Sequence, residues 1–208
     1  GYSKKILEEK TNSIIAFDRD IKTLKTANQF KSEFQNRFNF KNSKFSKINR
    51  LINPEDKIKG IFFDLGYSSL QIKDHTKGLS FNFKGKLNMK MGFNNFSAHE
   101  TINNLDSKSL ENIFKYFGEE AYSRPIVKKI CNLRKEKEIL TEDLVKIINI
   151  VKRKSNKKIH NATKIFQALR IFVNQEISEL INGLINSFNV IPVGGIIAVV
   201  TFHSLEDK

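Results

Sequence analysis

Residues 60–72, GIFFDLGYSSLQI, join a strand-like apolar run to side chains that could take part in chemistry. The apolar run meets Asp64, and a glycine and three hydrogen-bonding side chains follow within a few positions: Gly66, Ser68, Ser69 and Gln71. A turn at this point would require the glycine but none of the polar side chains. Because ligands of open parallel sheets bind beyond the carboxyl ends of the strands, we expect these residues to line a ligand site.

A second carboxylate, Asp18, ends another apolar run, NSIIAF. If both runs are strands of one parallel sheet, then Asp18, Asp64 and the segment after Thr201 line a single crevice. An acid that ends the second strand, roughly 20 residues after a glycine-rich loop, can accept hydrogen bonds from a ribose. Asp18 fits this role if Gly1 is the last glycine of such a loop. The alternative is a helix N-cap, a role that Asp20 could fill equally well.

Other side chains of catalytic type have weaker cases. His203, in TFHSLEDK, follows the last apolar run and could face a ligand, and a structural histidine is an equal alternative. Glu206 and Asp207 favour the first turn of a following helix, where acids are stabilising. The single cysteine, Cys131, fits a small core residue. No group of His, Cys, Asp or Glu residues has the spacing of metal ligands, and no complete P-loop occurs, so we expect no metal.

The elements that would position these side chains follow from the apolar periodicity. Helical and strand-like segments alternate in the first part of the chain, with helices expected at 2–10, 20–30 and 45–52 and strands ending at Asp18, near residue 42 and at Asp64. Continuous apolar strands separated by helices are typical of a parallel sheet covered on both faces. We therefore predict an α/β fold.

The pattern changes after residue 72. Residues 73–97 are irregular and too long for a simple connection. Helical periodicity then dominates, with Thr141 as the expected N-cap of one helix and a single long helix from about Thr163, which would bury Ile181 and Leu184. PVGGIIAVV predicts a turn and another buried strand. We infer a first sheet segment, a helical insertion and a second sheet segment, at 1–97, 98–156 and 157–208.

The chain is strongly basic, with 36 Lys and Arg residues against 22 Asp and Glu residues and a formal net charge of +14. This excess favours a polyanionic partner, and a lysine-rich solvated surface is the alternative. Two basic stretches of the helical insertion, RPIVKKICNLRKEK and VKRKSNKKIH, could grip phosphates. Their candidate phosphate-binding residues are Arg124, Lys128, Lys129, Arg134, Lys152, Arg153 and Lys154. One cysteine suits a reducing compartment, and we find neither a signal peptide nor an apolar run of about 20 residues.

Several sequence blocks resemble, in order, those of the bacterial ribosomal RNA small subunit methyltransferase H family: AFDRD, FDLGYSSLQI, GLSF, LNMKM, YFGEEAYSR, HNATKIFQALRIFVNQEISEL and GGIIAVVTFHSLEDK. The resemblance covers nearly the whole chain. It implies a Rossmann-like class I methyltransferase fold with an inserted all-helical, RNA-recognising domain. It also implies a cytoplasmic enzyme that uses S-adenosylmethionine to methylate N4 of a cytidine in 16S ribosomal RNA. By the same resemblance GYS ends the cofactor loop, so the first strand, most of that loop and a C-terminal stretch are expected outside residues 1–208.

The resemblance also implies which positions contact the cofactor. The backbone at Gly1 and Tyr2 would approach the methionine end, closely at Gly1 because glycine has no side chain. Asp18 would hold the ribose, and Phe45 would pack beside the adenine. The residues expected beside the transferring methyl group are Asp64 and Gln71.

Three positions depart from the family pattern. Tyr2 stands where histidine is common, which matters little for a backbone contact. Asn88 replaces the usual aspartate of the LDMRM block, which removes any charge that this position would supply. Asn161 replaces a common proline before the long helix, which loosens that turn.

The loop after Asp64 suits the implied reaction. A cytosine exocyclic amine is a poor nucleophile because its lone pair is delocalised, so transfer requires in-line placement and acceptors that hold the amine. Asp64, the backbone near Gly66 and the hydroxyls of Ser68 and Ser69 could supply them, and His203 is a further candidate. Turn capping is the alternative for the serines, and Asp64 could serve the cofactor alone.

Two other functions stay open at this point. One is an adenine or cytosine amino-methyltransferase that acts on DNA, and the other is a non-catalytic RNA-binding or ribosome-assembly factor on a methyltransferase fold. The sequence does not distinguish free RNA from an assembled subunit as the substrate, and it does not determine the oligomeric state. We expect no membrane partner.

Overall fold

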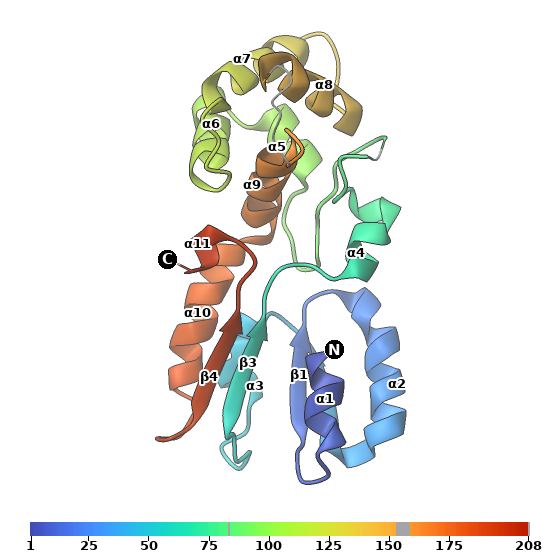
Figure 1. The fold of residues 1–208 in the computed structure, drawn as a ribbon, viewed down its shortest axis with the longest axis vertical. Coiled ribbons are helices and arrows are strands. Elements are labelled where there is room, and N and C mark those ends of the chain that lie inside the picture. Colours follow the sequence, from blue (N-terminus) through green and yellow to red (C-terminus); the bar gives the residue numbers. More distant parts are fainter. Residues whose placement is uncertain (83, 153–158, 208) are drawn as a thin grey trace. The chain divides into compact units, whose positions relative to one another are not determined.

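The computed structural model describes residues 1–82, 84–152 and 159–207. The chain folds into two compact units, whose elements are labelled in Figure 1. The first unit comprises Gly1–Phe63 and Ser178–Val200, and the second comprises Asp64–Ile177 and Thr201–Lys208. Asp18 therefore belongs to the first unit, whereas Asp64 is the first residue of the second.

Four short strands form the framework of the first unit. Strands β1 (Ile14–Asp18) and β2 (Phe38–Asn42) pair in parallel, with Asp18 opposite Asn42. Strand β3 (Gly60–Asp64) pairs with β4 (Ile196–Val200), and the arrows of β1, β3 and β4 point the same way in Figure 1. Runs of Ile, Val and Phe favour such parallel strands because helices cover them. The predicted α/β class and the strands that end at Asp18 and Asp64 are confirmed.

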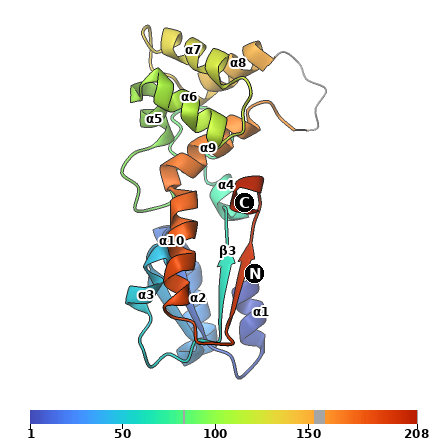
Figure 2. The same cartoon turned by 90° about the vertical axis from the view of Figure 1, so that its left-hand side faces the viewer.

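Helices lie on both sides of strands β3 and β4. Figure 2 shows α3 (Ile48–Leu51) and α10 (Glu176–Phe188) on one side and α1 (Tyr2–Glu8) on the other. A small core joins Leu7 of α1, Ala27 of α2 and Phe38 of β2. The remaining helical elements of this unit are 3-10 helix η1 (Ile21–Thr23), α2 (Leu24–Phe34), and 3-10 helices η2 (Gln35–Arg37) and η3 (Phe45–Lys47).

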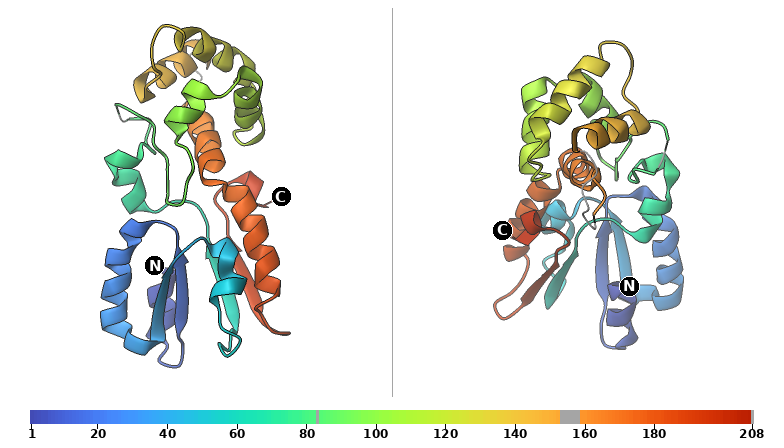
Figure 3. Two further views of the ribbon diagram at one scale, coloured as in Figure 1. Left: turned by 180° about the vertical axis from the view of Figure 1, so that it is seen from behind. Right: turned by 45° about the horizontal axis from the view of Figure 1, so that its top comes forward.

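The second unit is mainly helical, and Figure 3 shows its helices from two further sides. Its larger helices are α5 (Ala98–Asn104), α6 (Ser107–Tyr116), α7 (Ser123–Leu133), α8 (Thr141–Lys152) and α9 (Thr163–Asn174). Helix α6 packs against α7 and α9, and α5 also packs against α9. Residues 98–156, where described, are therefore mainly helical, and their core is shared with α9. That they form a separate inserted domain stays a prediction.

The irregular segment before these helices is anchored in the same core. After α4 (Ser69–Lys73) and 3-10 helix η4 (His75–Lys77), the described residues from Gly78 to Ser97 form neither helix nor strand. Leu87 and Met89 are nevertheless fully buried in the helical core. The backbone N–H of Met89 donates to the carbonyl of Lys77 at 2.6 Å, which fixes the segment despite its lack of regular structure.

Helix α8 begins differently from the prediction. Thr141 is its first helical residue and not the residue before it, and its hydroxyl donates to the carbonyl of Gly85 at 2.7 Å. The side chain that binds the exposed backbone N–H at this end is Asp143, whose Oδ2 accepts from Leu140 N at 3.2 Å. The expectation that Thr141 is the N-cap is wrong. Thr141 lies inside the helix, and its hydroxyl donates to the carbonyl of Gly85, which is distant in the chain.

The predicted single long helix from Thr163 is broken in two. Gln175 has left-handed backbone angles, φ 53° and ψ 37°, and separates α9 from α10. Asn174, just before the break, donates through Nδ2 to the carbonyl of Met89 at 2.8 Å and accepts from Met91 N at 3.0 Å. The expected burial of Ile181 is also wrong, since it is exposed on α10. In the part of the chain that the structure describes, no helix is long and apolar enough to cross a membrane.

Candidate functional site

The loop after β3 and the segment after β4 meet within the second unit. Gly66 has φ +86°, a conformation that favours glycine. A Cβ atom placed on Gly66 would lie 3.3 Å from Cδ2 of Phe202, which follows β4. The Phe202 ring is two-thirds exposed at 67%, and Tyr67 beside Gly66 is also exposed. The strand-end argument predicted this meeting of Asp64's loop with the segment after Thr201.

Ser68 and Gln71 form hydrogen bonds with each other at the start of helix α4. The Gln71 Oε1 atom accepts from Ser68 N at 2.9 Å, and Ser68 Oγ accepts from Gln71 N at 3.3 Å. This reciprocal pair satisfies two backbone donors at the helix start, as in a capping box. Ser68 therefore has the capping role that was its alternative, and Ser69 begins α4.

Asp64 is the exposed last residue of β3. Partial burial of its carboxyl group raises the pKa of Asp64 above the ordinary value. A carboxylate with a raised pKa accepts a proton more readily than an ordinary one. Among the predicted catalytic residues, Asp64 therefore has the surroundings that suit a proton acceptor.

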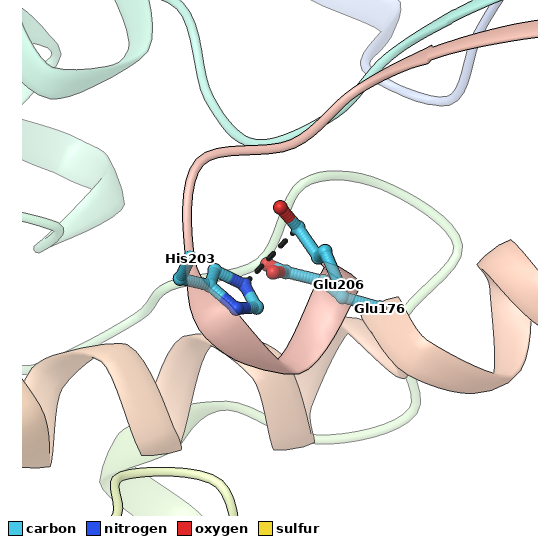
Figure 4. Close-up of side chains that lie close together, drawn as sticks. All are labelled: Glu176, His203 and Glu206. Carbon is cyan, nitrogen blue, oxygen red and sulfur yellow. Dashed lines mark ion pairs between the residues drawn. The ribbon is translucent and has the colours of Figure 1, made fainter. Parts of the chain in front are cut away.

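His203 lies in a buried cluster with two glutamates (Figure 4). Its Nε2 is 3.1 Å from Oε1 of Glu206, and the two side chains are 9% and 3% exposed. Burial lowers the pKa of His203; nearby Glu206 and Glu119 oppose this effect, and Arg170 adds to it. Burial therefore favours the neutral form of the imidazole. Glu206 and Asp207 lie in the short helix α11 (Ser204–Asp207), so their predicted place at a helix start is confirmed.

Sequence reasoning missed Arg170 and Glu176, which complete this cluster. The Arg170 guanidinium donates from Nε and Nη2 to Oε2 of Glu176, at 3.2 and 2.9 Å. It also lies 4.7 Å from the centre of the Tyr67 ring. Arg170 stands between two apolar residues on the buried face of α9, and an arginine at such a position needs a buried partner. That signal was available in the sequence.

The remaining predicted cofactor residues lie in the first unit. Gly1 is exposed, and the Tyr2 ring packs 4.6 Å from that of Phe62. At the end of β1, Asp18 accepts from Asp20 N through Oδ1 at 2.8 Å. Asp20 itself caps η1 by accepting from Lys22 N, so the capping role proposed as an alternative for Asp18 belongs to Asp20.

Phe45 is held in place by a glycine on α10. Its ring lies edge-on to Phe63, with centroids 5.3 Å apart. A Cβ atom on Gly183 would lie 2.7 Å from Cδ2 of Phe45, so only glycine leaves room for this ring. The six predicted cofactor residues thus form two described groups, with Asp64 and Gln71 in the second unit.

The predicted RNA-binding cations divide into exposed and internally bonded groups. Three are exposed on helix α7, namely Arg124, Lys128 and Lys129. Arg134 instead donates to the carbonyls of Ile102 and Leu105, at 3.1 and 2.6 Å. Lys152 Nζ lies 2.6 Å from Oε2 of the buried Glu120. Arg153 and Lys154 lie outside the described residues.

The family model and the similar proteins found by comparison indicate the same family. A family model described as the MraW methylase family matches residues 1–208. The chain is 40% identical to the ribosomal RNA small subunit methyltransferase H of Orientia tsutsugamushi (strain Ikeda), over the whole chain and 68% of that protein. It is 39% identical to the protein of the same name from Bartonella tribocorum and 41% identical to that from Maricaulis maris, covering 62% and 63% of them.

Proposed function

The chain belongs to the MraW methylase family, and we propose that it methylates N4 of a cytidine in 16S ribosomal RNA with S-adenosylmethionine. The fold we propose is of the Rossmann-like class I type, and the reaction takes place in the cytoplasm. Relatives named for methylation of small-subunit ribosomal RNA support the substrate. The single observation that carries the proposal is the meeting of Gly66 and Phe202 at the carboxyl ends of β3 and β4.

The chain offers suitable groups for the cofactor. Asp18, at the carboxyl end of β1, can accept hydrogen bonds from the ribose. Phe45, whose ring is fixed against Gly183, presents an apolar surface for the adenine. Gly1 and Tyr2 would line the methionine end, with Asp64 and Gln71 beside the reactive carbon. Bound S-adenosylmethionine supplies a methyl group on a positively charged sulfur.

The loop after β3 offers groups for the target base. Phe202 and Tyr67 expose aromatic rings on which an unstacked base can stack. Because Gly66 has no side chain, the Phe202 ring can lie close to the loop backbone, near the exposed Tyr67. Asp64 can accept a hydrogen bond from the exocyclic amine, orient its lone pair and take up the proton that the amine releases. The side chain of Ser68 caps α4, whose first residue is Ser69.

We assign the proton acceptor to Asp64 and not to His203. The His203 ring is nine-tenths buried beside Glu206 and not exposed to a base. Phosphates are assigned to the exposed cations of α7, Arg124, Lys128 and Lys129. A cytidine in folded RNA must leave its stack to reach the loop, and the cost of that step is a source of selectivity.

A transfer assay with three substrates tests this function. The protein, as its natural gene encodes it, is incubated with methyl-labelled S-adenosylmethionine and unmodified small subunits, free 16S RNA or duplex DNA. We expect label in ribosomal RNA and none in DNA. Label in DNA alone would identify a DNA amino-methyltransferase. Cofactor binding without label in any substrate would identify a non-catalytic assembly factor.

A further inference from the structure

Glu176, His203 and Glu206 form a compact group of potential metal ligands inside the second unit (Figure 4). One ligand atom from each residue can be chosen such that all three lie within 4.8 Å of one another. They come from the start of α10, the segment after β4 and α11, and the sequence alone did not place Glu176 with the other two. All three side chains are largely buried, with exposed fractions of 14%, 9% and 3%.

The imidazole of His203 is directed into this group without a hydrogen bond. Its Nε2 lies 3.1 Å from Glu206 Oε1, yet neither ring nitrogen has a hydrogen-bond partner among the described residues. A buried imidazole normally forms such bonds. Two ligand atoms bound to one ion at about 2.1 Å are roughly 3.0–3.4 Å apart. The spacing of Nε2 and Oε1 therefore suits a shared cation.

Both carboxylates are oriented by further donors. Arg170 holds Oε2 of Glu176, and the backbone N–H of Phe202 donates to Oε2 of Glu206 at 2.9 Å. Metal sites commonly orient their ligands through such outer contacts. Each carboxylate thus has one oxygen fixed by the protein, and for Glu206 the second oxygen is the one that faces His203.

The local charge also suits a divalent cation. Glu176 and Glu206 carry one negative charge each, and Glu119 is a third carboxylate whose charge reaches the His203 ring. Arg170 contributes one positive charge. The two ligand carboxylates and Arg170 together leave one net negative charge, which favours a bound cation. Buried charges of one sign are costly unless they are paired or bind a metal.

We propose that Glu176, His203 and Glu206 bind one divalent transition-metal ion. One imidazole nitrogen and two carboxylate oxygens suit zinc and its neighbours in the series, whereas magnesium prefers oxygen ligands alone. The ion would join the segment after β4 to the break between α9 and α10. It would thereby hold Phe202, the residue before His203, against the Gly66 loop. Zinc binding at this site can be measured without the transfer activity proposed above.

Zinc binding can be measured by calorimetry on tag-free protein that has been treated with a chelator. We expect one zinc ion per chain in the wild type and at least tenfold weaker binding in His203→Ala and Glu206→Gln. His75→Ala removes an exposed histidine of the same unit and serves as the matched control, with unchanged binding expected. Wild-type protein that binds no zinc, or His203→Ala protein that binds it equally well, would overturn the proposal.

X-ray absorption at the zinc edge identifies the ligands without relying on a variant that folds poorly. We expect one imidazole and oxygen neighbours at about 2.0–2.2 Å. A sulfur neighbour at about 2.3 Å would place the ion on the single thiol, Cys131, and would overturn the proposal. Zinc should also raise the melting temperature of the wild type and of Cys131→Ser, but not that of Glu206→Gln.

Discussion

Gly66 and Phe202 lie in contact although one follows β3 and the other follows β4. A Cβ atom on Gly66 would be 3.3 Å from the Phe202 ring, and the backbone of Gly66 has a positive φ. Two sequence blocks that are far apart in the chain, FDLGYSS and TFHSLED, are thereby brought to one place. This contact gives the loop an exposed aromatic surface beside a carboxylate, which is what a polar flat base requires.

Gly66→Ala should reduce methyl transfer. The new methyl group would press on Phe202, and the left-handed backbone costs a non-glycine residue about 1–2 kcal/mol. Gly85→Ala is the matched control, because Gly85 also has a positive φ but has no atom within 4 Å of its Cβ position. Both variants should lose stability in urea unfolding, and only Gly66→Ala should also lose transfer at a temperature where both are folded. Equal transfer by the two variants would show that methyl transfer does not require the contact between Gly66 and Phe202.

Asp18→Ala should weaken binding of S-adenosylmethionine by about 1.5–3 kcal/mol, the value of a hydrogen bond to a charged group. The reason is that Asp18 ends β1, where a ribose can be held, while Asp20 already caps η1. Calorimetry on the protein from its natural gene measures the change, with Glu55→Ala as an exposed control in the same unit. An unchanged dissociation constant in folded Asp18→Ala protein would show that Asp18 does not bind the cofactor. Its role would then be to accept the hydrogen bond from Asp20 N.

Replacing Arg124, Lys128 and Lys129 with Gln should weaken RNA binding and reduce its salt dependence. For each cation that binds a phosphate in the wild type, its removal should lower the slope of log affinity against log salt by roughly 0.7–0.9. The control replaces three exposed cations of the first unit, Lys4, Lys5 and Lys10, and so removes the same charge. If both triple variants showed the same decrease in affinity, the effect would come from net charge and not from α7.

Lys152→Met should destabilise the protein rather than its RNA complex. Lys152 pairs with Glu120 Oε2 at 2.6 Å, and their side chains are only 15% and 2% exposed. Removing one partner of a buried pair leaves an uncompensated charge and costs about 3–5 kcal/mol. Chemical denaturation measures this loss, and the double variant Lys152→Met/Glu120→Gln should recover most of it. A single variant as stable as Lys128→Met would mean that the pair is solvated.

The sequence allows the prediction of structural features that depend on residues close together in the chain. The strands that end at Asp18 and Asp64 could be predicted because each is a continuous apolar run followed by an acid. The break at Gln175 could not, because the apolar pattern continues across it. At the break, the side chain of Asn174 instead bonds to the distant backbone of Met89 and Met91.

The residues of the candidate site also divide into those that a local pattern predicts and those whose partners are distant in the chain. A basic run predicts a surface for phosphate, yet Arg134 and Lys152 are bound by partners far away in the chain. The group of Glu176 and His203 was invisible for the same reason, since strand β4 lies between them in sequence. Local patterns therefore identified the strand ends, whereas the fold was needed to show that Arg134 and Lys152 are internally bonded.

Nucleoside mass spectrometry after the transfer reaction tests the central claim most directly. Small-subunit RNA is incubated with the wild-type protein and with Asp64→Asn, digested to nucleosides and analysed for methylated bases. The account predicts N4-methylcytidine in the wild-type reaction and a severe loss of that product with Asp64→Asn while RNA affinity is retained. Methyl groups found on C5 of cytosine, on adenine or on ribose, with N4-methylcytidine absent, would contradict it.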